Sequence, residues 1–214
     1  MEEGRIAVVD YGMGNLRSVW QALVRVAGAR EVVVTADPSV VARAGRVVFP
    51  GQGAMPDCMR ELDARGLRPA VLDAARTKPF LGICIGLQML FEHSEEGDVP
   101  GLGVFPGRVR RFPAERMAAP GGIRLKVPHM GWNEVAQTRP HALWKGIGDG
   151  ARFYFVHSYY VDPEDPACAA GVTCHGVPFT SAVARDNIFA MQYHPEKSAQ
   201  AGLALLSNFV EWTP

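Results

Sequence analysis

One cysteine lies in a segment that is typical of a displayed nucleophile. Cys84 follows the apolar run 80–83 and has Gly82 and Gly86 on either side. A side chain at a sharp strand-to-helix turn projects from the edge of the sheet, and the unpaired N–H groups of the following helix point toward it. Helix N-termini and cationic imidazoles stabilise a thiolate, which is the nucleophilic form of cysteine. The segment therefore predicts a reactive thiol that needs a base.

A candidate base comes near the other end of the chain. His194 follows the strand-like run 188–193, and Glu196 comes two residues later. Residues i and i+2 of an extended segment point to the same side, so we expect the Glu196 carboxylate to reach the imidazole. Pro195 is expected to keep this segment out of a helix. Cys84, His194 and Glu196 are thus predicted to be nucleophile, base and orienting acid.

A glycine-rich loop is the third part of the predicted site. Gly51, Gln52 and Gly53 come soon after the apolar run 46–49. Glycines permit backbone conformations that expose N–H groups to a bound oxygen, so the loop is a candidate oxyanion hole. The N–H of Ile85, the residue after the cysteine, is the expected second donor. Alone, the loop would be interpreted as an ordinary turn; with the thiol and the base, it indicates acyl transfer.

The elements that position these residues alternate in the first half of the chain. Apolar runs at 5–9, 31–34, 46–49 and 80–83 predict buried strands. A helix is expected from Leu16 to Ala27, with Asn15 as its N-cap. Apolar strands that alternate with helices predict an α/β fold with an open, mostly parallel sheet flanked by helices. Such sheets bind ligands beyond the carboxyl ends of their strands, where Cys84 and the glycine loop fall.

The second half of the chain has a different pattern. Strand-like runs without intervening helices predict antiparallel additions at 105–112, 122–126, 152–161, 167–173 and 179–185. A closing helix is expected after Ser198, which would cap it. With 214 residues, 48% of them hydrophobic, and no visible linker, residues 1–214 are expected to form a single domain.

Charge and composition exclude several classes of protein. Lys plus Arg and Asp plus Glu each total 22, so no net field attracts nucleic acid or an anionic membrane. No apolar run approaches the roughly 20 residues that cross a bilayer. Cys58, Cys168 and Cys174 are expected to be buried, reduced thiols, and the start of the chain lacks the pattern of a secretion signal. We expect a cytoplasmic protein without a metal ion or other cofactor, which acts on a small molecule or a protein partner.

Several motifs resemble one enzyme family. The segment 82–88, with His194, Pro195 and Glu196 far downstream, resembles the signature of class I, triad-type glutamine amidotransferases. Segments 9–16, 50–55, 128–133 and 157–160 resemble the glutaminase subunits of imidazole glycerol-phosphate synthases, which serve histidine biosynthesis. The likeness covers nearly the whole chain, although Gln52 stands where an apolar residue is expected. It implies a flavodoxin-like fold and hydrolysis of glutamine to glutamate and ammonia through a glutamyl thioester.

The resemblance also implies contacts with the substrate and a partner. Gln88, Gly53 and the backbone around Ser158 and Tyr159 would hold the amino-acid head of glutamine. The partner would be a (β/α)8-barrel cyclase subunit in a heterodimer. The cyclase would use the ammonia to convert N′-phosphoribulosyl-formimino-AICAR to imidazole glycerol phosphate and AICAR. The docking face and ammonia exit are expected at an aromatic and amide patch formed by Met130, Gly131, Trp132, Asn133 and Tyr154.

Three alternatives remain open. The same glutaminase chemistry serves pyridoxal phosphate, anthranilate and guanylate synthesis in related subunits, although segments 10–15 and 130–133 favour histidine biosynthesis. A cysteine peptidase or γ-glutamyl hydrolase on the same fold would turn over its substrates without a partner. An interaction module without catalysis would keep its function after Cys84→Ala.

Overall fold

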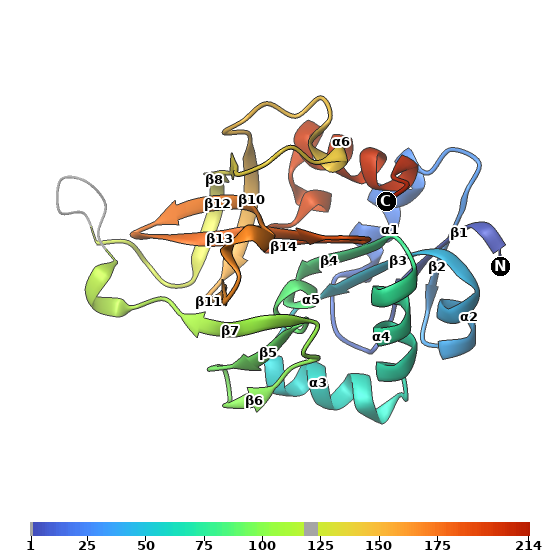
Figure 1. The fold of residues 1–214 in the computed structure, drawn as a ribbon, viewed down its shortest axis with the longest axis horizontal. Helices are drawn as coiled ribbons and strands as arrows, with labels where there is room; N and C mark the ends of the chain where they lie inside the picture. The colour runs from blue at the N-terminus through green and yellow to red at the C-terminus, as the bar shows by residue number, and fades with distance from the viewer. Residues whose placement is uncertain (1, 118–123) are drawn as a thin grey trace.

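The computed structural model describes residues 2–117 and 124–214. The parallel part of its main sheet has the strand order β2-β1-β3-β4-β14. Figure 1 shows these strands side by side, from β14 in the middle of the view to β1 and β2 on the right. Four of them come from the first half of the chain and one from near its end: β1 (Glu2–Val9), β2 (Glu31–Thr35), β3 (Ala44–Gly51), β4 (Phe80–Cys84) and β14 (Ile188–Met191).

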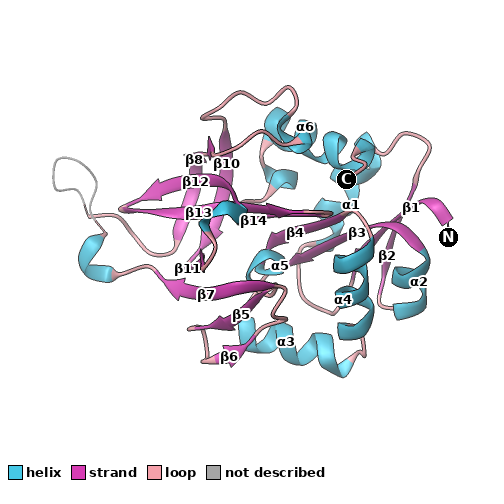
Figure 2. Ribbon diagram, viewed as in Figure 1, coloured by secondary structure: helices cyan, strands magenta, loops and turns pink. Residues whose placement is uncertain are grey.

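Helices cover this part of the sheet on both faces, as Figure 2 shows. The five longer helices are α1 (Leu16–Val26), α2 (Pro38–Arg43), α3 (Met55–Ala64), α4 (Arg68–Thr77) and α6 (Ala199–Glu211). Helix α1 packs against α6, and α2 packs against α4. Strands β3 and β4 lie between these layers, and their apolar side chains are buried, which explains their continuous apolar sequences. The predicted α/β fold with its mostly parallel sheet is confirmed.

Antiparallel strands extend the sheet beyond β14, as the second half of the sequence predicts. The order continues as β13-β11-β7-β5-β6, with β12 and β9 attached to β13. Strand β5 runs parallel to β7, while the other pairings here are antiparallel. The bounds are β5 (Phe91–Ser94), β6 (Val99–Pro100), β7 (Phe105–Arg111), β9 (Ala136–Gln137), β11 (Tyr159–Pro163), β12 (Ala169–His175) and β13 (Val177–Arg185).

A separate two-stranded ladder pairs β8 (His129–Glu134) with β10 (Arg152–His157). The prediction of a single strand at 152–161 is therefore wrong. Strand β10 ends before Ser158, and the chain continues from the ladder into β11 of the main sheet. The strand expected at 122–126 falls partly outside the described residues, and within 124–126 only Arg124 forms a bridge. In the described part of the chain, no helix combines the length and the apolar character needed to span a membrane.

Candidate active site

Cys84 ends β4 in a backbone conformation that few side chains adopt. Its φ of 56° and ψ of −111° lie outside the ordinary strand and helix regions. Such a conformation costs on the order of 1–3 kcal/mol and persists only where the surrounding structure enforces it. The following helix, α5 (Ile85–Gln88), is a single turn rather than a long helix. The chain thus reverses sharply at Cys84, as the sequence predicts.

The positions of Gly82 and Gly86 require glycine, because the packing around this reversal leaves no room for a side chain. A Cβ atom on Gly86 would lie 1.9 Å from the carbonyl oxygen of Phe49, and one on Gly82 would lie 2.8 Å from the Cβ of Ala190. The α5 turn therefore packs directly on β3, and β4 packs tightly against β14. The motif glycines fix the position of the thiol through close backbone packing.

The glycine loop lies beside Cys84. Gly51 is the register partner of Cys84 in the parallel pair β3 and β4. A Cβ on Gly51 would lie 1.9 Å from the hydroxyl oxygen of Tyr11, which is fully buried under the loop. The Cys58 thiol donates to the carbonyl oxygen of Gln52 at 3.7 Å, and Gly53 has a φ of 110°. The loop thus needs glycine at two positions.

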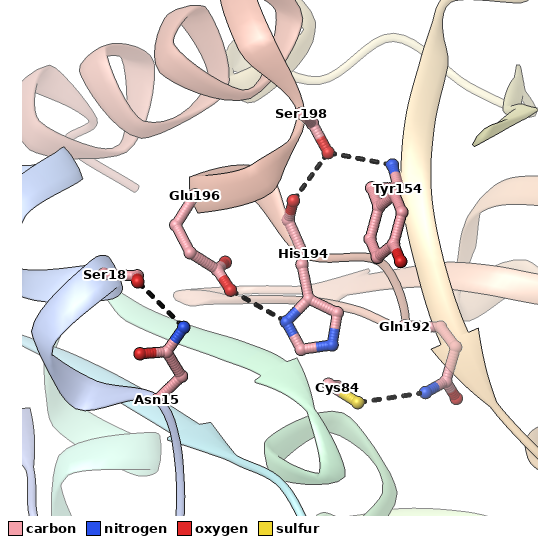
Figure 3. Close-up of polar contacts among 8 residues, drawn as sticks. All are labelled: Asn15, Ser18, Cys84, Tyr154, Gln192, His194, Glu196 and Ser198. Carbon is pink, nitrogen blue, oxygen red and sulfur yellow. Dashed lines mark hydrogen bonds and ion pairs between the residues drawn. The ribbon is translucent and has the colours of Figure 1, made fainter. Parts of the chain in front are cut away.

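His194 and Glu196 form a buried pair just after β14. The distance from His194 Nδ1 to Glu196 Oε1 is 2.9 Å, and the two side chains are 5% and 1% exposed. Figure 3 shows the imidazole ring between the Glu196 carboxylate and Cys84. The expected extended geometry is wrong, because Pro195–Lys197 forms a 3₁₀ turn. The fixed φ of proline suits the first position of a helical turn, and this turn brings the carboxylate back to the ring.

Ser198 holds the main chain of His194 rather than capping α6 with its side chain. Its hydroxyl donates to the His194 carbonyl oxygen at 2.5 Å and accepts from the Tyr154 N–H at 3.0 Å (Figure 3). The N–H of His194 in turn donates to the Tyr154 carbonyl oxygen at 2.9 Å. These bonds join the imidazole-bearing segment to β10.

The electrostatic environment of His194 favours its charged form. Burial lowers the pKa of His194, but the contact with Cys84 and the hydrogen bond with Glu196 outweigh burial and raise the pKa to about 10. An imidazolium ion next to a thiol stabilises the thiolate. The arrangement can therefore supply a nucleophile and a proton donor from two adjacent side chains.

A cavity of about 280 Å³ opens at this pair. Cys84 and His194 line it, and so do six of the residues predicted from the sequence: Gln52, Gly53, Ile85, Gln88, Ser158 and Tyr159. Of the remaining predicted residues, Glu196 lies behind His194, and Gly51 lies beside Cys84 under the loop. The structure thus brings together segments that are separated by more than 100 positions in the chain.

The sequence reasoning missed three residues of the site. Glu96 lines the cavity, and its Oε2 accepts from the Met55 N–H at 2.9 Å. His157 also lines the cavity and is 6% exposed. The third is Gln192, whose Nε2 lies 3.7 Å from Cys84 Sγ. Gln192 lies two residues before His194, and His157 begins the segment 157–160 that resembles the family, whereas Glu96 lies in an ordinary charged turn.

The predicted docking patch lies on the β8–β10 ladder. Met130 and Trp132 are 64% and 45% exposed, and the Trp132 ring contacts that of Tyr154 at 6.2 Å between centroids. Asn133 is different, because its amide donates inward to the carbonyl oxygen of Cys174 at 2.9 Å. Cys174 is exposed, so its expected burial is wrong, whereas the burial expected for Cys58 and Cys168 is confirmed.

Comparison with known proteins agrees with the fold and the motifs. The sequence model for class I glutamine amidotransferases matches residues 7–212. A solved structure described as a glutamine amidotransferase superposes with a TM-score of 0.70 at 17% identity, covering 96% of this chain and 97% of that one. The glutaminase domain of Trypanosoma brucei CTPS with bound acivicin gives 0.64 at 16% identity, covering 98% and 95%. The fold is that of the class I glutamine amidotransferases.

Other relatives are much more similar in sequence to this chain than these two structures are. The imidazole glycerol phosphate synthase subunit HisH of Dechloromonas aromatica (strain RCB) is 73% identical over 98% of this chain and 97% of its own length. The subunit of the same name from Nitrosomonas europaea is 61% identical over 98% and 99%. The chain therefore belongs to the HisH family of class I glutamine amidotransferases.

Proposed function

We propose that the chain hydrolyses glutamine to glutamate and ammonia at Cys84. The observation that carries this proposal is the buried His194–Glu196 pair, whose imidazole lies next to the thiol at the wall of a small cavity. A glutaminase needs these components, because an amide carbon must be attacked and its nitrogen must leave with a proton.

The cavity wall suits the amino-acid head of glutamine. Glu96 contributes an acidic side chain to the lining, and Gln88 Oε1 is buried with no hydrogen-bond partner among the described residues. Both groups attract the substrate's α-ammonium group. The backbone N–H groups of Gly53, Ser158 and Tyr159 would meet its carboxylate. A volume of about 280 Å³ suits a single amino acid.

The reaction would proceed through a thioester. The Cys84 thiolate attacks the side-chain carbonyl carbon of glutamine, while backbone N–H groups at Gly51 and Gln52 of the loop and at Ile85 stabilise the oxyanion. His194 gives its proton to the departing nitrogen, so the C–N bond breaks and ammonia leaves. Neutral His194 then takes a proton from water, which attacks the thioester and releases glutamate. Glu196 holds the imidazole in position throughout.

The ammonia would pass to a (β/α)8-barrel cyclase subunit in histidine biosynthesis. The HisH names of the relatives support this partner, since they denote one subunit of a synthase. The exposed side chains of Met130 and Trp132, with Tyr154, would form the docking face and ammonia exit. This proposal places the enzyme in the cytoplasm with its biosynthetic substrates.

Partner binding would also control the rate. A glutaminase that works alone wastes glutamine, and Gly51 and Gly53 allow the loop to reorient its peptide groups when the cyclase binds its ligand. We therefore expect the isolated chain to be much slower than the liganded complex.

One assay tests the chemistry and the partner together. The chain is mixed with the barrel cyclase and its ribonucleotide substrate, and glutamate release is followed against glutamine concentration. The proposal predicts saturable release that depends on the cyclase and is lost in Cys84→Ala but kept in Cys174→Ala. Glutamate release that persists in Cys84→Ala would refute the proposed chemistry. Release at the same rate with and without the cyclase would refute control of the rate by the partner.

A further inference from the structure

A line of hydrogen bonds runs through the wall of the cavity from strand β8. Asn133 Nδ2 lies 3.2 Å from His129 Nε2, and His129 Nδ1 lies 2.9 Å from His157 Nε2. The line continues from His157 Nδ1 to the carbonyl oxygen of Tyr159, at 2.7 Å. Gln88 Nε2 reaches the same carbonyl oxygen at 3.0 Å. Two buried histidines thus connect Asn133 of the β8–β10 ladder with Gln88 in the wall of the cavity.

The direction of every bond in this line is fixed by its ends. The Tyr159 carbonyl oxygen accepts only, so His157 carries its proton on Nδ1, and its Nε2 accepts from His129. His129 then also carries its proton on Nδ1, and its Nε2 accepts from the Asn133 amide. A separate bond from Asn133 Nδ2 to the Cys174 carbonyl oxygen, at 2.9 Å, sets the orientation of that amide. Both histidines are therefore neutral Nδ1–H tautomers.

Their surroundings maintain the neutral form. His129 and His157 are 4% and 6% exposed and lie among aromatic rings, including Phe112 and Phe155. Burial lowers the pKa of each histidine to about 3, and neighbouring histidines, including His175, lower it in the same sense. A protonated ring would have no acceptor, so it would break the line.

At the other end, the line orients two amides at the candidate nucleophile. Gln88 Nε2 gives its hydrogens to Tyr159 O and to Gln192 Oε1, the latter at 2.9 Å. Gln88 Oε1 is consequently left free to accept from a ligand in the cavity. Because Gln192 Oε1 accepts from Gln88, its Nε2–H group is turned toward Cys84 Sγ, at 3.7 Å.

We propose that His129 and His157 are positioning residues for glutamine binding. By holding the Tyr159 carbonyl, they set the orientation of the Gln88 amide, so that its oxygen meets the substrate's ammonium group. The same orientation turns the Gln192 N–H toward the sulfur of Cys84. This inference rests on the proposed glutaminase function.

Glutaminase kinetics of the full complex with the cyclase and its ligand test the inference. His157→Phe keeps the ring packing but removes both polar atoms. We expect it to lower kcat/KM for glutamine about tenfold or more, mostly through KM. His157→Gln retains one donor and one acceptor, so it should recover most of that loss. His129→Phe should lower kcat/KM as much as His157→Phe does. The double variant should lower it no further than either single variant, because each single change already disconnects the same hydrogen bonds.

His175→Phe is the matched control. This ring stacks on His129 at 4.1 Å between centroids, but its Nε2 bonds the Lys126 carbonyl oxygen outside the line. It should change KM by less than about twofold. Equal effects of His157→Phe and His175→Phe, or no recovery in His157→Gln, would overturn the positioning role while leaving glutaminase activity established. An inactive native complex would instead overturn the proposed function.

Imidazole ¹⁵N NMR spectra of the full chain test the line without turnover. The structure predicts two neutral Nδ1–H tautomers, assigned through His129→Phe and His157→Phe, that persist down to about pH 5. An Nε2–H tautomer at either residue, or a protonated ring at that pH, would contradict the direction of the line.

Discussion

Glu196 Oε1 lies 2.9 Å from His194 Nδ1, and both side chains are almost fully buried. This contact fixes which nitrogen of the ring keeps a proton and leaves Nε2 to exchange one with Cys84 or the substrate. Such a buried carboxylate–imidazole pair is costly unless both members are satisfied, so its retention beside a strained cysteine points to chemistry rather than to stability.

Glu196→Gln should reduce glutaminase activity about 10²-fold or more, because the imidazolium loses its anionic partner. The KM for glutamine should change little, since Glu196 does not line the cavity. Steady-state kinetics of the complex measure both values. The charge-matched control is Glu211→Gln, which removes an exposed partner of Arg30. Equal activities of the two variants would contradict the role of Glu196.

Gly86→Ala should destabilise the fold by about 3 kcal/mol, because its Cβ would lie 1.9 Å from the Phe49 carbonyl oxygen. Urea denaturation measures the loss. Gly148→Ala is the control, since no atom of the described residues lies within 4 Å of a Cβ there. If both variants unfold at the same urea concentration, the close packing of α5 on β3 does not stabilise the fold.

The buried histidines predict a loss of stability in acid. His129 and His157 have a pKa of about 3 in the folded protein against an ordinary value of 6.5. The unfolded chain therefore binds more protons between these values, and the free energy of unfolding falls as the pH drops through that window. Each histidine contributes a slope of about 1.4 kcal/mol per pH unit. Urea titrations at several pH values should give His157→Phe a shallower slope than the native chain; identical slopes would contradict the prediction.

Trp132→Ala should weaken binding of the cyclase by about 2 kcal/mol or more, roughly 30-fold in Kd, if Trp132 anchors the docking face. Calorimetric titration of the two subunits measures the affinity. Trp20→Ala is the control, because Trp20 is 38% exposed but lies on α1, away from the β8–β10 ladder. Unchanged affinity and coupling in Trp132→Ala would refute the assignment of this face.

The sequence predicted the parallel strands well because their signal is local. Continuous apolar runs mark β3 and β4, and the glycines beside Cys84 mark a turn at close packing. The position of Cys84 beside the glycine loop followed from the rule that ligands bind at the carboxyl ends of parallel strands.

Contacts between distant segments could not be read in this way. His129 and His157 meet because β8 pairs with β10, and no pattern in the sequence around either residue predicts the hydrogen bond between them. Asn15 and Ser198 stand at the N-caps of α1 and α6 as predicted, but neither side chain makes a capping bond: Ser198 uses its hydroxyl on His194 and Tyr154, and the Asn15 amide donates to Ser18 (Figure 3). Other local partners took up both side chains, and at Ser198 the distant Tyr154 N–H also competed for the hydroxyl.

The central claim is that glutamine is opened on the sulfur of Cys84. The most direct measurement is mass spectrometry of the complex quenched in acid during turnover of glutamine, followed by peptide mapping. The account predicts a glutamyl group on the peptide that carries Cys84, present in the native chain and in Cys174→Ala. Turnover without that adduct in the native chain, together with undiminished turnover by Cys84→Ala, would contradict it.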